Sequence, residues 1–176
     1  RQKGSAHFLE HSAFTGTKHF PGHTLIDYFE RQGMKFGRDI NAFTGFDRTI
    51  YWLSLPMEKT DSHVLDSAFL AVKDWLTAIS FDSERVRKEC SVIAEELRGY
   101  STGDDFYPLK IGKGRYAQRM PLGTEDDIRH INSATLQAFH SEWYAPQLAT
   151  VVVVGNIDAE KTVDMLQRNL SSIPRK

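Results

Sequence analysis

The chain has 176 residues, with 22 basic and 23 acidic side chains and a single cysteine. This length predicts one domain over residues 1–176, and the nearly balanced charge argues against a basic surface for nucleic acid or for an acidic membrane. One cysteine excludes an internal disulfide framework, and the longest apolar run is too short to span a bilayer.

The amino end has no segment with the charged, apolar and small-residue order of a signal peptide. Because the chain begins with Arg1 rather than Met, we expect a leader or an upstream segment to be missing. The compartment is therefore left open, and an extracytoplasmic or periplasmic location is compatible with the sequence.

Hydrophobic spacing predicts the following elements in chain order. Helices are expected over residues 4–13 and 23–32, and two strands over 36–43 and 49–55 form a hairpin. Further helices are expected over 63–79, from Asp82 or Ser83 to about 99, over 107–117 and over 133–143. A buried strand at 150–154 and a helix capped by Asp158 complete the chain. This order predicts an α+β fold, with helices packed on one face of a mainly antiparallel sheet.

The segment His7-Phe8-Leu9-Glu10-His11 carries the strongest chemical signal. On a helix, His7 and His11 lie one turn apart on one face, so both imidazoles can reach a single ion. Glu10 projects from nearly the same side. This is the inverted order of the H-E-x-x-H zinc motif, in which a carboxylate moves the proton of a zinc-activated water. The pattern predicts a catalytic Zn²⁺ site that still lacks a third protein ligand.

The helix after Ser83 offers three candidate carboxylates for that ligand. Its apolar residues form a narrow stripe that we expect to face the core: Val86, Cys90, Ile93 and Leu97. At ~100° per residue, Glu89 and Glu96 lie together on one flank of this stripe, and Glu95 points into solvent. One of the two flanking carboxylates is expected to bind the metal and the other to orient the ligands or a water.

These segments together resemble the pitrilysin family of zinc peptidases, which includes insulin-degrading enzyme and the mitochondrial processing peptidase. The resemblance begins with Gly4 to His11 and Phe14 to Thr17, and it continues in the Glu89 to Glu96 block. It also includes Pro121-Leu-Gly, Tyr144-Ala-Pro146 and the valine run. The likeness covers nearly the whole chain.

The resemblance implies a role for each matching residue. His7, His11 and Glu96 would bind zinc, Glu10 would be the general base, and Glu89 would support the ligands. A substrate-binding strand would consist of Asn41, Ala42, Phe43 and Thr44, and its edge would pair with an extended peptide or unfolded polypeptide.

The resemblance also implies a larger protein. Family members carry strands upstream of the histidine helix and a second homologous half, in the same chain or a partner chain, that closes over the substrate. We therefore expect the chain to be part of an amino-terminal catalytic half, truncated at its amino terminus. Alone, it is expected to be weakly active or inactive.

Two other functions remain to be compared with a zinc endopeptidase. A non-catalytic peptide-binding or scaffolding relative would keep the sheet, but such relatives usually lose a histidine or the glutamate of the motif. A lyase resembling S-ribosylhomocysteine lyase shares the H-x-x-E-H order, but it needs a cysteine ligand and another reactive cysteine. Cys90 is the only cysteine, which argues against the lyase.

Overall fold

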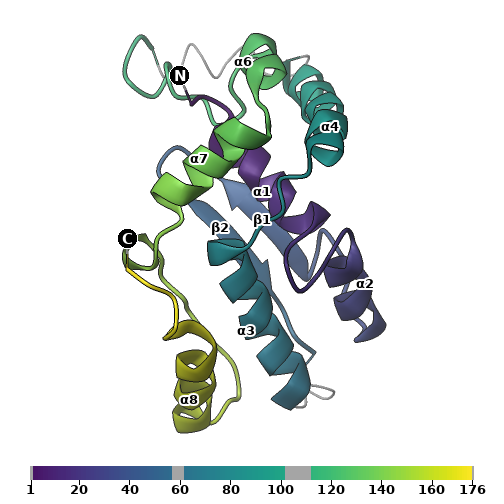
Figure 1. Cartoon of the computed structure of the whole chain (residues 1–176), viewed down its shortest axis with the longest axis vertical. Helices are drawn as coiled ribbons and strands as arrows, with labels where there is room; N and C mark the ends of the chain where they lie inside the picture. Colours follow the sequence, from purple (N-terminus) through teal and green to yellow (C-terminus); the bar gives the residue numbers. More distant parts are fainter. Residues whose placement is uncertain (1, 57–61, 102–111, 176) are drawn as a thin grey trace. The chain divides into compact units, whose positions relative to one another are not determined.

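The computed structural model describes residues 2–56, 62–101 and 112–175. Figure 1 shows the elements in chain order. They are α1 (Ser5–Thr15), α2 (Thr24–Arg31), β1 (Ile40–Thr44), β2 (Thr49–Leu53), α3 (Ser62–Thr77), α4 (Ser83–Ser101), α6 (Glu125–His130), α7 (Ser133–Trp143), the short 3-10 helix η2 (Pro146–Leu148) and α8 (Ala159–Leu170). The expected helices at 4–13, 23–32, 63–79, 83–99 and 133–143 and the helix after Asp158 are confirmed, with ends shifted by a few residues.

Contacts between residues divide the chain into two compact units. The first unit contains Arg1–Ser12, Ala42–Ile50 and Phe81–His140, and the second contains Ala13–Asn41, Tyr51–Ser80 and Ser141–Lys176. Helix α1 and both strands pass from one unit to the other. The single domain expected over residues 1–176 stays a prediction.

The hydrophobic core of the first unit joins α1 to α4, α6 and α7. Its buried members are Phe8, Val86, Ile93, Ile128, Ile131 and Leu136, with Phe81, Cys90 and Leu97 partly buried against them. The expected apolar stripe of α4 is therefore the side that packs. Phe8 is fully buried in this core. Because Phe8 follows His7 directly, its packing fixes the height and rotation of the histidine helix beside α4.

Side-chain caps define where the helices of this unit begin. The Asp82 carboxylate accepts a hydrogen bond from the backbone N–H of Arg85 at 3.0 Å, which makes Asp82 the cap of α4. Thr124 and Asp127 form a reciprocal capping box at the start of α6. Such caps satisfy N–H groups that the first turn of a helix cannot pair internally. Helices α4 and α6 then run side by side in Figure 1.

The second unit is built around α3, which packs against α8. The indole of Trp75 donates a hydrogen bond to the carbonyl of Ala13 at 3.0 Å, and its ring stacks on Tyr51. The fully buried Asp74 accepts hydrogen bonds from the Thr17 hydroxyl and from the backbone and ring of His19. These bonds anchor the loop between α1 and α2 and satisfy a carboxylate that would otherwise be costly to bury.

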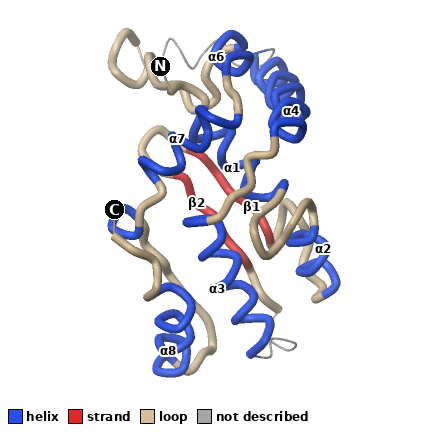
Figure 2. The backbone as a smooth tube through the Cα atoms, viewed as in Figure 1, coloured by secondary structure: helices blue, strands red, loops and turns tan. Residues whose placement is uncertain are grey.

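Strands β1 and β2 form a hairpin, drawn in red in Figure 2. The backbone N–H of Gly45 bonds to Arg48, and that of Ser54 bonds to Asp39 at the other end. These two pairs place Thr44 opposite Thr49 and Phe43 opposite Ile50 in an antiparallel register. Because side chains alternate along a strand, Thr44 and Phe43 point to opposite faces of the hairpin.

Two of the expected elements have different bounds in the structure. The first strand begins at Ile40 rather than at residue 36, because a turn at Gly37 (φ +84°) precedes it. The carboxylate of Asp39 stabilises this turn by accepting a bond from the N–H of Lys35. The helix expected over 107–117 is wrong for residues 112–117, which form turns that include Gly112 at φ +62°. Residues 107–111 lie outside the described residues.

The buried strand expected at 150–154 is also wrong. These residues form no ladder, and Val152 and Val154 are 77% and 89% exposed. A strand needs a neighbour for its backbone hydrogen bonds, and the sheet of the described residues contains only β1 and β2. Hydrophobicity alone therefore predicted burial where the described part of the chain offers no pairing partner.

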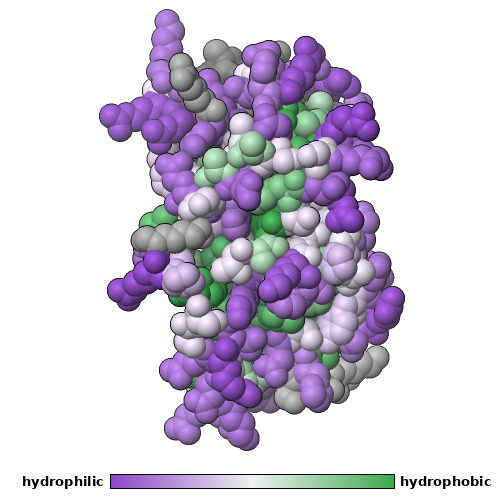
Figure 3. All heavy atoms as spheres, viewed as in Figure 1, coloured by the Kyte–Doolittle hydropathy of each residue, from purple (hydrophilic) through white to green (hydrophobic). Residues whose placement is uncertain are grey.

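The surface is mainly polar on the face shown in Figure 3, where hydrophobic side chains appear in small groups between hydrophilic ones. Within the described ranges, no helix combines the length and apolar character needed to cross a membrane.

Candidate metal centre

Helix α1 presents two imidazoles on one face of the first unit. His7 and His11 are four residues apart, and their ring centroids are separated by 4.7 Å at an interplanar angle of 65°. Phe8 and Leu9 are fully buried on the same helix, and His7 is only 7% exposed. The histidine pair therefore lies at the edge of the core rather than on an open surface.

Helix α4 adds a carboxylate to this pair. The Glu96 oxygens lie 3.7 Å from His7 Nε2 and 3.4 Å from His11 Nε2. One donor atom from each of these residues lies within 4.8 Å of the other two. Zinc binds nitrogen and oxygen at about 2.0–2.2 Å, so two ligands of a tetrahedral ion are about 3.3–3.5 Å apart. The two distances from the histidines to Glu96 are close to this spacing, and the donor set suits zinc.

His7 is neutral near pH 7. Burial, together with the neighbouring His11 and against an opposing effect of Glu89, lowers its pKa to about 4. The 3.7 Å contact with Glu96 is therefore not an ion pair, although its length would allow one. The Nδ1 atom of His7 is buried and has no hydrogen-bond partner in the described structure. A buried imidazole held neutral is in the protonation state that a metal requires.

His11 is oriented by a second carboxylate of α4. Its Nδ1–H donates to Glu89 Oε1 at 2.8 Å, which turns Nε2 toward Glu96. Burial lowers the pKa of His11, but the hydrogen bond and charge of Glu89, with the charges of Glu96 and Glu10, outweigh it and leave a raised pKa. A carboxylate behind a metal-binding histidine fixes its tautomer and increases its basicity.

Glu10 is buried beside the histidines, and its carboxylate is held by the hairpin. The hydroxyl of Thr44 donates a short hydrogen bond to Glu10 Oε2. Burial raises the pKa of Glu10, while the bond from Thr44 and the charge of His11 oppose that rise. Sequence reasoning placed Thr44 only in a substrate strand and missed this contact, because no spacing rule connects residues 10 and 44.

The four residues expected to bind substrate all lie in β1. Asn41 donates from its side chain to the carbonyl of Gly37 at 2.9 Å, so it stabilises the preceding turn. Phe43 is 58% exposed, whereas Thr44 is buried on the opposite face. Ala42 shares the face of Thr44. The side chains therefore divide between solvent and the interior, and the role of the strand in substrate binding stays a prediction.

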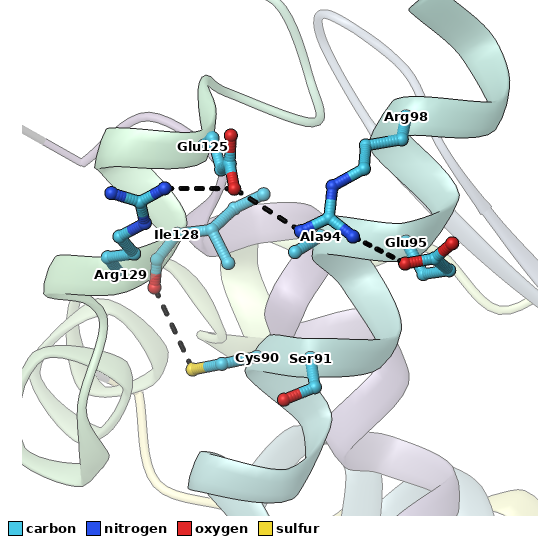
Figure 4. Close-up of a pocket in the computed structure, with 8 residues that line it drawn as sticks. All are labelled: Cys90, Ser91, Ala94, Glu95, Arg98, Glu125, Ile128 and Arg129. Atoms are coloured by element: carbon cyan, nitrogen blue, oxygen red, sulfur yellow. Dashed lines mark hydrogen bonds and ion pairs between the residues drawn. The ribbon is translucent and has the colours of Figure 1, made fainter.

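The other side of α4 carries Glu95, whose side chain is 75% exposed and pairs with Arg98 at 2.6 Å. Figure 4 shows this side, where a cavity of about 280 Å³ lies between α4 and α6. Arg98 and Arg129 both contact Glu125, and the Cys90 thiol donates to a backbone carbonyl of α6. These charges pair with one another, and burial raises the pKa of Cys90. The polar groups around this cavity therefore serve to hold α4 and α6 together.

Comparison with known proteins agrees with this geometry. Residues 1–106 match the family described as insulinase (peptidase family M16), and residues 130–176 match the peptidase M16 inactive domain. The chain is 36% identical over 176 residues to the probable zinc protease PqqL of Escherichia coli, and 37% identical over 175 residues to PqqL of Haemophilus influenzae. Each alignment covers 97% of this chain and 19% of the relative, so the chain spans about a fifth of their length.

Solved structures extend the agreement to the fold. The crystal structure of the first half of the periplasmic protease PqqL from Escherichia coli matches with a TM-score of 0.88 at 35% identity, covering 98% of this chain and 38% of that one. The expected α+β fold, mainly helical with a small antiparallel sheet, is confirmed. The relatives are probable zinc proteases, and the cluster of two histidines and a glutamate is consistent with zinc. The chain belongs to peptidase family M16, the insulinase or pitrilysin family.

Proposed function

We propose that the chain is the zinc-binding part of an endopeptidase that hydrolyses extended peptides. The convergence of His7, His11 and Glu96 beside the buried Glu10 carries this proposal. These three residues would hold the zinc ion. When bound, zinc supplies Lewis-acid activation of a water and of the scissile carbonyl.

Glu10 is the proposed general base. Thr44 holds its Oε2 atom, so Oε1 is the oxygen available to take a proton from the attacking water. The same carboxyl group then returns the proton to the leaving amine. A pKa raised by burial suits this role, because proton transfer is most efficient when the pKa of the catalytic group approaches the working pH.

Glu89 is the proposed supporting residue. Its carboxylate fixes the Nδ1–H tautomer of His11 and leaves the Nε2 lone pair directed toward the cluster. It does not need to contact the substrate to do so. The arrangement assigns the two carboxylates on this flank of α4 to different tasks, since Glu96 faces both imidazoles and Glu89 faces only one.

The proposed substrate lies along β1 as an added strand. In the described residues β1 is at an edge of a two-stranded sheet, which supports pairing with an extended peptide. Main-chain pairing gives affinity with little choice of sequence, and neighbouring side chains add preference. Phe43, exposed on this strand, offers an apolar contact for a substrate side chain.

A second homologous half is the proposed partner of this site, either in the same chain or in another. The curated relatives are about five times as long as the matched region, which supports the need for further structure around the substrate. The full-length protein is therefore the form in which turnover is expected.

The test is a comparison of zinc content and peptide cleavage in the full-length protein. Glu10→Gln is expected to retain zinc and to lose at least about 100-fold in kcat, the scale of a missing general base. His11→Ala is expected to lose both zinc and activity. Glu30→Gln, an exposed substitution in α2, is the matched control and should change neither.

The alternative is a non-catalytic peptide-binding relative. It would bind zinc and peptide without cleaving the peptide, so the wild-type protein and Glu10→Gln would both show no cleavage. Full activity in Glu10→Gln would contradict the assigned base.

A further inference from the structure

A basic segment of the first unit has no role in the site described above. Lys113, Arg115 and Arg119 lie within seven residues, and residues 112–123 contain no acidic side chain. All three basic side chains are exposed. None forms an ion pair with any described residue, in contrast to the arginines around Glu125 on α6. Among the described residues, the segment therefore presents three positive charges that are not paired with a carboxylate.

One part of this segment is attached to the tip of the β1–β2 hairpin. The ring of Tyr116 packs edge-on against Phe46, with ring centroids 5.0 Å apart. Its hydroxyl donates to the Asp47 carboxylate at 3.4 Å. Phe46 follows Thr44 by two residues, so the contact lies close to the proposed substrate strand. Arg48 in the same tip is exposed and adds a fourth positive charge.

The other end of the segment is attached to the start of the histidine helix. Gly4 approaches the 121–123 turn so closely that an added Cβ would lie 2.9 Å from the carbonyl oxygen of Leu122. Gly4 and Gly123 both have positive φ, at +76° and +72°. His7 follows Gly4 by three residues. The basic segment thus runs from the tip of the β1–β2 hairpin to the start of α1, which carries His7 and His11.

We propose that Lys113, Arg115 and Arg119 select acidic side chains in the peptide that pairs with β1. This inference rests on the proposed peptidase function and names its substrate class. Guanidinium and ammonium groups are hydrogen-bond donors that attract carboxylates, and a cluster of one sign also steers an acidic peptide during encounter. The charge of Asp47 is the only acidic one at the hairpin tip, and Tyr116 contacts it.

The experiment measures peptide binding in the full-length Glu10→Gln protein, so that cleavage does not interfere. Three fluorescent peptides of equal length and equal apolar content carry either glutamates, glutamines or lysines at the same positions. At low salt, the glutamate peptide is expected to bind about 10-fold more tightly than the glutamine peptide, from three exposed charge pairs of modest strength. The difference should shrink as salt is raised, because exposed charges are screened.

The double variant Arg115→Gln and Arg119→Gln tests whether this segment causes the preference. It is expected to bring the two affinities within about 3-fold while leaving the affinity for the glutamine peptide unchanged. Arg168→Gln, in α8, is the control for a lost positive charge at an exposed position elsewhere. Equal binding of all three peptides, or a glutamate preference that survives in the double variant, overturns the inference.

Zinc content and cleavage of a neutral peptide, measured on the wild-type protein, report separately on the proposed function. If the protein binds zinc and cleaves peptides without a preference for acidic ones, the proposed function stands and only the proposed substrate class is refuted.

Discussion

The choice between two adjacent glutamates on α4 gives the sharpest test of the metal centre. Glu96 lies within 3.7 Å of His7 Nε2 and 3.4 Å of His11 Nε2, whereas Glu95 pairs with Arg98 and is 75% exposed. Four-ligand zinc sites bind with about 10–16 kcal/mol, or about 2.5–4 kcal/mol per ligand. Glu96→Gln is therefore expected to weaken zinc binding by about 100-fold to 1,000-fold.

The matched variant Glu95→Gln removes the same charge one residue away and should change zinc affinity by less than about 2-fold. Both affinities can be measured at pH 7.5 by competition with a chromophoric chelator, on protein whose folding is checked by circular dichroism. Equal affinity in the two variants, or weaker binding in Glu95→Gln, would refute the assignment of Glu96 as a ligand.

Three further predictions concern the residues around the ligands. Glu89→Gln should weaken zinc binding by about 10-fold to 100-fold in the same chelator competition, because His11 loses the charged hydrogen-bond partner of its Nδ1 atom. Thr44→Val should leave zinc content unchanged but move the acidic limb of the kcat/KM profile to higher pH, because the Thr44 hydroxyl bond holds the pKa of Glu10 down and its removal raises that pKa; an unshifted limb would contradict this. In metal-free protein, the raised pKa of Glu10 favours the folded state below its unfolded pKa of 4.5, and this contribution is lost as pH rises through the folded pKa. Urea unfolding with a chelator should therefore show Glu10→Gln gaining stability over wild type between pH 4.5 and 7.5.

Features that depend on one helix were predictable from the sequence. The stripe Val86, Cys90, Ile93 and Leu97 follows from helical periodicity, and the structure packs it into the core of the first unit. The same rotation of about 100° per residue separates Glu95 from Glu89 and Glu96, and the observed exposures agree. Helix geometry is rigid, so the direction of each side chain is fixed once the packed face is known.

Features that depend on a partner element were less predictable. The run from Val151 to Val154 has the composition of a buried strand, yet it is largely exposed. Composition reports what a segment gains by burial, whereas a strand also needs a neighbour at about 4.8 Å with matching backbone groups. Residues 112–117 gave an error of another kind, because the turn glycines Gly112 and Gly114 outweigh the helical tendency of the side chains around them.

The contact between Thr44 and Glu10 belongs to this second class and has a mechanistic consequence. Thr44 follows Phe43 directly, and the two side chains point to opposite faces of β1. A peptide paired along β1 would hydrogen-bond to the backbone of this strand. The same strand carries the buried Thr44 hydroxyl, which holds the proposed base Glu10. A shift of β1 along its axis by one residue would exchange the two faces and remove the hydroxyl from Glu10. In the proposed mechanism, the strand register would therefore couple the position of a bound peptide to that of the carboxylate, and changes in the hairpin are expected to affect kcat as well as KM.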